Sequence, residues 1–164
     1  MKKILLLGLL LCLFMPTFSG PKSKAQKDTE QFHYDIECAG NGAPGTYLVK
    51  VWSYSRNAKV AAEQGKKNAV HGVIFKGFST NSYGKGQAAL AKNPGVEMEN
   101  AAYFEEFFKQ GGEYQKYVSA VSGTQEVMKV GKEYRVGIVF SVAKDDLRKA
   151  LEAAGVIKGL NYGF

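Results

Sequence analysis

Small residues recur at helical spacing through residues 58–72. The positions are Ala58, Ala61, Ala62, Gly65, Ala69 and Gly72. Side chains this small let a helix backbone come close to a neighbouring layer. The polar residues between them are Lys59, Glu63, Lys66 and Lys67. Asn57 precedes the segment, and its side-chain oxygen can accept a hydrogen bond from a free helical N–H group. We therefore predict a helix that begins after Asn57 and packs tightly against a sheet.

Two strands are expected before this helix. Residues 32–38 alternate apolar and polar side chains, and residues 46–55 are rich in β-branched and aromatic residues. The segment between them, residues 39–45, is dense in turn-forming residues. These features predict an antiparallel hairpin with a long loop.

A second hairpin and a final helix are expected at the carboxyl end. Residues 124–130 and 132–143 have strand character and meet at Gly131-Lys132. The last helix is expected to start at Asp145 or Asp146 and to stop at Gly155. Between the hairpins we predict a strand at residues 72–78, an irregular connection at 79–96 and an aromatic helix at 99–110. Residues 113–121 are expected to form a turn of helix or a strand.

The expected fold class is therefore α+β. We predict two layers, a mostly antiparallel sheet of about five strands with three or four helices packed on it. Residues 26–164 are expected to form a single globular domain.

The amino terminus has the organisation of a secretory signal peptide, residues 1–25. Two lysines precede a twelve-residue apolar run at 4–15, shorter than the roughly twenty residues that span a bilayer. Cleavage is predicted after Ala25, with Ser19 as a second candidate. Lipid attachment at Cys12 is not expected, because Leu11 stands where a lipoprotein signal usually has a small residue. We predict an exported protein, periplasmic or associated with the outer envelope, with no integral membrane segment after signal removal.

The charge gives little support to nucleic-acid binding. The whole chain carries a net charge of +7, but residues 1–25 contribute four lysines and no acids, which leaves +3. No nucleic-acid partner is therefore expected.

Sequence motifs for catalysis or metal binding are absent. Gly65 and Lys66 lack the spacing and the Ser or Thr of a phosphate-binding loop. His33 and His71 are the only histidines, and they lack a metal-ligand spacing. His71 is expected at a helix end, interacting with terminal carbonyl groups. No catalytic residue, metal site or cofactor is predicted, and the protein is not expected to be an enzyme.

Cys38 is the only cysteine left after signal removal, so no intramolecular disulfide can form. Its place on the apolar phase of a strand predicts a small buried side chain.

Aromatic residues provide the candidate binding positions. Trp52 and Tyr54 share the strand face opposite Val49 and Val51, so we expect this pair to be exposed. Tyr83 lies in the long irregular connection, and Phe108 lies on the aromatic helix. These four residues are the tentative binding set.

The carboxyl-terminal stretch YRVGIVFSVAKDDLRKALEAAGVI and the segment NAKVAAEQGKKNAVHGVIF carry a resemblance. Together, over about residues 46–157, they resemble the amino-terminal module of flagellar assembly protein T and related small envelope lipoprotein domains. The resemblance implies an antiparallel sheet with helices on one side and an adaptor role without catalysis. It supplies no active-site residues.

The leading functional prediction is a non-catalytic cell-envelope protein, an adaptor or assembly component that binds another protein. The alternatives are a module that binds glycans or peptides through exposed aromatic rings, and a small hydrolase with an unrecognised site.

Overall fold

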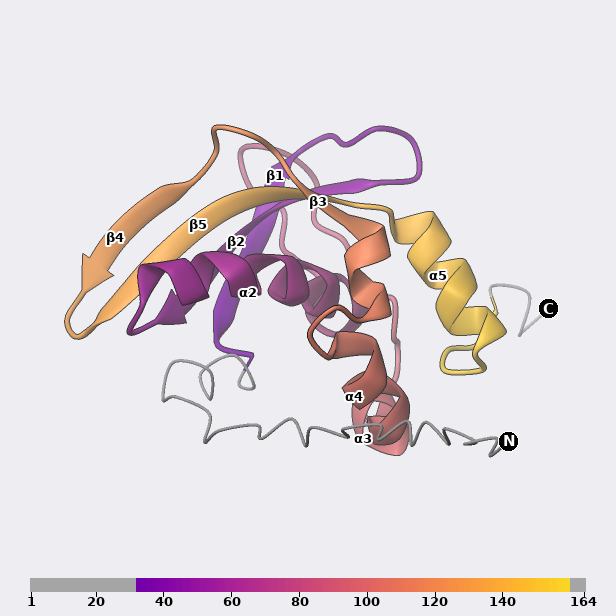
Figure 1. Cartoon of the computed structure of the whole chain (residues 1–164). Coiled ribbons are helices and arrows are strands. Elements are labelled where there is room, and N and C mark those ends of the chain that lie inside the picture. The colour runs from indigo at the N-terminus through magenta and orange to yellow at the C-terminus, as the bar shows by residue number, and fades with distance from the viewer. Residues whose placement is uncertain (1–31, 160–164) are drawn as a thin grey trace, which may run out of the picture.

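The computed structural model describes residues 32–159 (Figure 1). Its strands are β1 (Tyr34–Gly40), β2 (Tyr47–Ser55), β3 (Val118–Ala120), β4 (Glu126–Val130) and β5 (Glu133–Val142). Its α-helices are α2 (Ala58–His71), α3 (Val96–Glu99), α4 (Ala101–Phe108) and α5 (Lys144–Ala153). The strands form one five-stranded antiparallel sheet, so the predicted α+β class is confirmed.

The sheet order is β1-β2-β5-β3, and β4 also pairs with β5. The β1–β2 hairpin has the predicted form, with Ile36 opposite Val51. The β4–β5 hairpin turns at Gly131, whose φ of +60° is a conformation that side chains disfavour. β3 pairs with the end of β5 and β4 with its beginning. Together β3 and β4 form one edge of the sheet, interrupted by residues 121–125, which contain a turn.

Helix α2 packs on β2 and β5 through the small-residue face. Asn57 caps it, with its Oδ1 accepting from the N–H of Lys59 at 2.9 Å. Gly65 lies against the ring of buried Phe140, where a Cβ atom would fall only 2.7 Å from the ring tip. Figure 1 shows α2 crossing the sheet. The prediction of a closely packed helix is therefore confirmed.

The predicted strand at residues 72–78 is wrong. The chain continues from α2 into a π-helical turn (Gly72–Lys76) and stops at Gly77, which has a φ of +66°. A short apolar run does not distinguish a buried strand from a buried helix. Here the run extends an existing helix and buries Val73 and Ile74. The fifth strand is instead β3, which follows a 3₁₀ helix (Glu113–Tyr117) in the segment expected to be a turn of helix or a strand.

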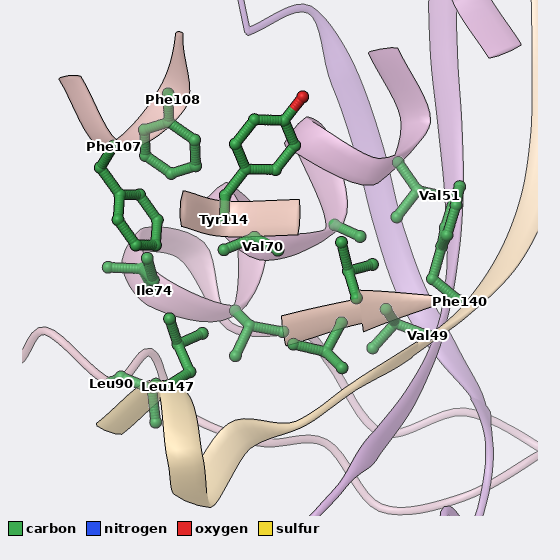
Figure 2. Packing of buried hydrophobic residues seen from close by; sticks show 14 of the residues in the cluster. Val49, Val51, Val70, Ile74, Leu90, Phe107, Phe108, Tyr114, Phe140 and Leu147 are labelled. Atoms are coloured by element: carbon green, nitrogen blue, oxygen red, sulfur yellow. The ribbon is translucent and has the colours of Figure 1, made fainter. Parts of the chain in front are cut away.

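The hydrophobic core lies between the sheet and the helices. Figure 2 shows Val49, Val51 and Phe140 from the strands facing the same interior as side chains of the helical layer. The helical contribution comes from Val70, Ile74, Phe107, Phe108, Tyr114 and Leu147. Phe75, Phe104 and Phe107 are in edge-to-face or stacked contacts with neighbouring rings. Most of the aromatic residues of α4 therefore serve the core.

Helix α5 begins at Lys144, and neither predicted aspartate caps it. Asp145 and Asp146 lie in its first turn, and no side chain makes a cap hydrogen bond there. Their negative charges lie near the positive end of the helix dipole. The helix ends before Gly155, as predicted.

The predicted signal peptide, its cleavage site and Cys12 fall within residues 1–31, outside the described residues. Among the residues described, no helix is both long and apolar enough to span a membrane.

Candidate functional site

Trp52 lies on the face of the sheet opposite α2. Its ring lies over the backbone of Gly137 on β5, where a Cβ atom would fall 2.5 Å from a ring carbon. The Nζ atom of Lys50 and the guanidinium carbon of Arg135 lie 4.3 and 4.1 Å from the ring centroid. Its Nε1–H group donates to Glu37 at 2.8 Å. These contacts leave Trp52 only 7% exposed, so the expectation that it is exposed is wrong.

Tyr54 lies beside Trp52 on the same face and is half-buried. Its hydroxyl group donates to Oδ2 of Asp35 at 2.6 Å, and its ring stacks on His33. Burial and the hydrogen bond to Asp35 raise the pKa of Tyr54 above its usual value. Lysine, arginine and acidic side chains therefore accompany the aromatic rings across this face, which forms a polar surface.

The other two predicted binding residues lie elsewhere. Tyr83 is 70% exposed in the connection after the π-helical turn, where its N–H donates to Oδ1 of Asn81. Phe108 is buried in the core beside Tyr114. Only Trp52 and Tyr54 are neighbours, so the four residues do not form one continuous aromatic surface.

His71 occupies a different position from the one expected. It is 5% exposed and lies where α2 passes into the π-helical turn. Its Nδ1 lies 2.6 Å from the hydroxyl oxygen of Tyr34, and its Nε2 lies 3.1 Å from Oε1 of Glu97. The ring stacks on Phe32 at a centroid distance of 3.6 Å. The expected interaction with helix-end carbonyl groups is replaced by these side-chain contacts, because the chain continues from His71 into the π-helical turn.

The electrostatics of this network favour an uncharged imidazole. Burial and the positive charges of Lys76 and Lys67 lower the pKa of His71 to about 3. Burial also raises the pKa of Tyr34 and that of Glu97. An ionised Glu97 would favour the protonated ring, but the loss of hydration and the two lysines outweigh a carboxylate that is itself partly exposed.

The hydrogen bonds fit one tautomer of the neutral ring. A carboxylate can only accept, so Nε2 carries the proton toward Glu97 and Nδ1 accepts from the Tyr34 hydroxyl. The network joins β1, α2 and α3. Sequence reasoning missed it because the three residues lie 37 and 26 positions apart, without a local motif.

The two edges of the sheet differ in how they meet solvent. On β1, the carbonyl of Tyr34 accepts from Lys76 Nζ at 3.4 Å and that of Cys38 accepts from Asn81 Nδ2 at 2.8 Å. On the opposite edge, within residues 32–159, β4 pairs with β5 alone. All five β4 residues are exposed, including Val127, Met128 and Val130. We refer to β4, Glu126–Val130, as the open edge.

The open edge lies on the side of the molecule away from α3, α4 and α5 (Figure 1). Exposed sheet edges are usually blunted by charge, by bulges or by covering segments, because their backbone groups can pair with another chain. Charge is limited here to Glu126, which pairs with Lys50 at 2.7 Å, and to Lys129. The combination of exposed apolar side chains and an available strand edge makes the open edge the candidate functional site.

The described residues contain no group of three or more His, Cys, Asp or Glu side chains arranged to hold a metal ion. Cys38 is buried, as predicted, and its thiol lies 3.7 Å from the carbonyl oxygen of Gly40.

Comparison of the chain with known protein families, with curated proteins and with solved structures finds no match. The functional argument therefore rests on the geometry of the molecule.

Proposed function

We propose that this protein is a non-catalytic component of the cell envelope that binds another protein through the open edge. The observation that carries the proposal is the run of five exposed residues on a strand with one unpaired side among the described residues. An extended segment of a partner can add to such an edge, with main-chain hydrogen bonds providing affinity and side chains providing specificity.

The side chains of the open edge define what the partner should look like. Glu126, Met128 and Val130 point to one face of the strand, and Val127 and Lys129 point to the other, so each face presents apolar side chains beside one charge. Lys129 and Lys132 make no ion pair with any residue in 32–159. We therefore expect the partner segment to be extended, with apolar residues at alternate positions and at least one acidic residue near Lys129.

The contrast between the two edges supports this assignment. Lys76 and Asn81 occupy carbonyl groups of β1, which leaves that edge less able to accept a new strand. The open edge has no comparable side-chain hydrogen bond from the described residues. The proposed location in the envelope rests on two predictions from the sequence. These are export by a signal peptide and the resemblance to the flagellar assembly module.

The alternatives have less support. A glycan- or peptide-binding groove needs several accessible rings, but Trp52 and Phe108 are buried. A hydrolase based on the Tyr34–His71–Glu97 network would need an accessible hydroxyl, but Tyr34 is buried. Neither alternative has an observation of its own in its favour.

Two exposed methionines provide a matched test. Met128 lies on the open edge and is 40% exposed, and Met98 lies on α3 and is 84% exposed. A photo-crosslinking amino acid is introduced at position 128 or at position 98 in cells that naturally make the protein, and the crosslinked products are identified.

We expect a discrete crosslinked partner from position 128 and none from position 98. Met128→Lys should abolish co-purification of the same partner, whereas Met98→Lys should not. Equal crosslinking from both positions, or recovery that is insensitive to Met128→Lys, would contradict the proposal.

A further inference from the structure

A cleft of about 580 Å³ lies at the opposite side of the fold from the open edge. It is formed by the segment that leads into α3, by α3 itself, and by α5 with the residues that follow it. Its volume lies within the usual range for sites that bind small molecules. Nothing in the proposed protein-binding function uses this cleft.

The inner wall of the cleft is aliphatic. Leu90, Val96, Val156 and Ile157 line it, and all four belong to the hydrophobic core. The cleft therefore reaches from solvent to the main core beside α3. An apolar group entering it would exchange water for aliphatic neighbours.

The rim of the cleft is cationic. Lys92, Arg148 and Lys158 line it together with a single acid, Glu99. Arg148 forms an ion pair with Glu152, at an Nη1–Oε1 distance of 3.6 Å, and Glu152 Oε1 makes no hydrogen bond among the described groups. Lys92 and Lys158 make no ion pair with residues 32–159. With Glu99 in the lining and Glu152 beside Arg148, the three cations leave an excess of one positive charge, which favours a negatively charged ligand.

The two asparagines of the cleft are already engaged. Asn93 Oδ1 accepts from the N–H of Gly95 at 2.9 Å, and Asn100 Nδ2 donates to the carbonyl of Val96 at 2.9 Å. They hold the turn before α3 and the end of that helix. The available donors for a ligand are therefore the three cations, and the guanidinium group of Arg148 can bind a carboxylate through two parallel hydrogen bonds.

We propose that this cleft binds a small amphipathic carboxylate, in which one acidic head group is joined to an aliphatic chain of about ten carbons. The head group pairs with Arg148 and Lys158, and the chain lies against Val96 and Ile157. The site is separate from the open edge in position and in chemistry.

The experiment uses the purified full-length protein and decanoate as the probe. Decanoate binding is followed by displacement of the anionic fluorophore 1-anilinonaphthalene-8-sulfonate, and decanol serves as the uncharged molecule of equal chain length. Adjacent cations on α5 provide matched variants. Arg148 lines the cleft, whereas Lys149 is 77% exposed and pairs with Asp146.

We expect Arg148→Gln to weaken decanoate binding roughly tenfold, as loss of one charge-assisted contact would. Lys158→Gln should weaken it in the same direction, and Lys149→Gln should leave it unchanged. Decanol should bind more weakly than decanoate and should respond to none of these variants. Circular dichroism establishes that each variant is folded.

Three outcomes would overturn the proposal. Equal displacement of the fluorophore by decanol and by decanoate would show that the cations do not bind the carboxylate head group. Decanoate displacement that is lost in Met128→Lys but unchanged in Arg148→Gln would place decanoate at the open edge and not in the cleft, a result that leaves the proposed function untouched. Decanoate binding that occurs only after removal of residues 160–164 would mean that the end of the chain itself occupies the cleft.

Discussion

The hydroxyl oxygen of Tyr34 lies 2.6 Å from Nδ1 of His71, which ties the first strand of the sheet to the last residue of α2. The other ring nitrogen of His71 lies 3.1 Å from Glu97. Because the ring is buried and both nitrogens have partners, the protonation of the His71 imidazole depends on whether the chain is folded. This buried network is the main titratable feature of the core, and it leads to the first prediction.

Stability should fall as the pH decreases below about 6.5. The pKa of His71 is about 3 in the folded protein and near 6.5 in an unfolded chain, so the unfolded state binds the proton first. The stabilisation is fully present above pH 6.5 and is lost toward pH 3, with a limiting slope of about 1.4 kcal/mol per pH unit. Urea unfolding between about pH 7 and pH 4.5 measures the slope.

Other groups also titrate at low pH, so the comparison with His71→Gln isolates the contribution of His71. That variant should be less stable than the wild type at pH 7, and the difference should shrink as the pH falls. The NMR resonance of the His71 ring, assigned with the help of His33→Gln, should not titrate above about pH 4.5. A resonance that titrates near pH 6.5 would show that the ring is accessible to protons in the folded state.

Gly65→Ala should destabilise the protein. The new methyl group would lie 2.7 Å from the ring tip of Phe140, whose ring is almost fully buried and cannot move away cheaply. We expect a loss of about 1–3 kcal/mol from overpacking, which outweighs the helix-propensity gain of up to 1 kcal/mol. Chemical denaturation measures the change.

A second substitution tests the cause. In the double variant Gly65→Ala with Phe140→Leu, the smaller side chain should make room, so the total destabilisation should be less than the sum of the single effects. Strict additivity would argue that the cost of Gly65→Ala has another origin.

Gly137→Ala should displace the ring of Trp52. A Cβ atom at position 137 would meet three ring carbons within 2.8 Å. The ring is also held in place by Lys50 and Arg135, which lie over it, and by its hydrogen bond to Glu37. Trp52 is the only tryptophan of the chain, so its fluorescence reports the change directly. We expect emission at longer wavelength, easier quenching by acrylamide, and a stability loss of about 1–3 kcal/mol.

Ser141→Ala, on the same face of β5, is the control and should leave the emission unchanged. An unshifted spectrum in Gly137→Ala would refute the packing described for Trp52.

The thiol of Cys38 should react only when the protein opens. Cys38 is buried on β1, and Gly84 packs so closely that a Cβ there would lie 2.8 Å from the sulfur. In a Cys12→Ser background, Ellman's reagent should react slowly under native conditions and completely in concentrated guanidinium chloride. Tyr83→Cys adds an exposed thiol as a positive control. Rapid labelling of Cys38 under native conditions, or a disulfide-linked dimer on a non-reducing gel, would contradict this.

Much of the fold could be predicted from local patterns. The alternation in β1 identified which of its side chains face the core, and the small residues of α2 identified the face that meets the sheet. These features are readable because strand and helix periods differ and because each element buries only one face. The same logic failed at Val73 and Ile74, where an apolar run without a clear period could join either element.

The candidate sites were less accessible to sequence reasoning. The opposite faces of β2 were assigned correctly, but the exposure of Trp52 was not, because Gly137 and the covering cations come from other strands or positions. The open edge could not be found either, since an edge is defined by which strand lacks a neighbour. The cleft joins residues near 90–100 with residues near 148–159, whose proximity is a property of the folded chain.

The sequence by itself determined the α+β class, both hairpins, the capped helix with its small-residue face and the burial of Cys38, because these depend on periodicity and on residue size. Tertiary structure alone decided that His71 is enclosed between Tyr34 and Glu97, that Trp52 lies beneath Lys50 and Arg135, and that β4 has an open side. The physical reason is that burial, pairing and charge balance depend on neighbours brought together across the chain. A local pattern records only the preferences of each segment.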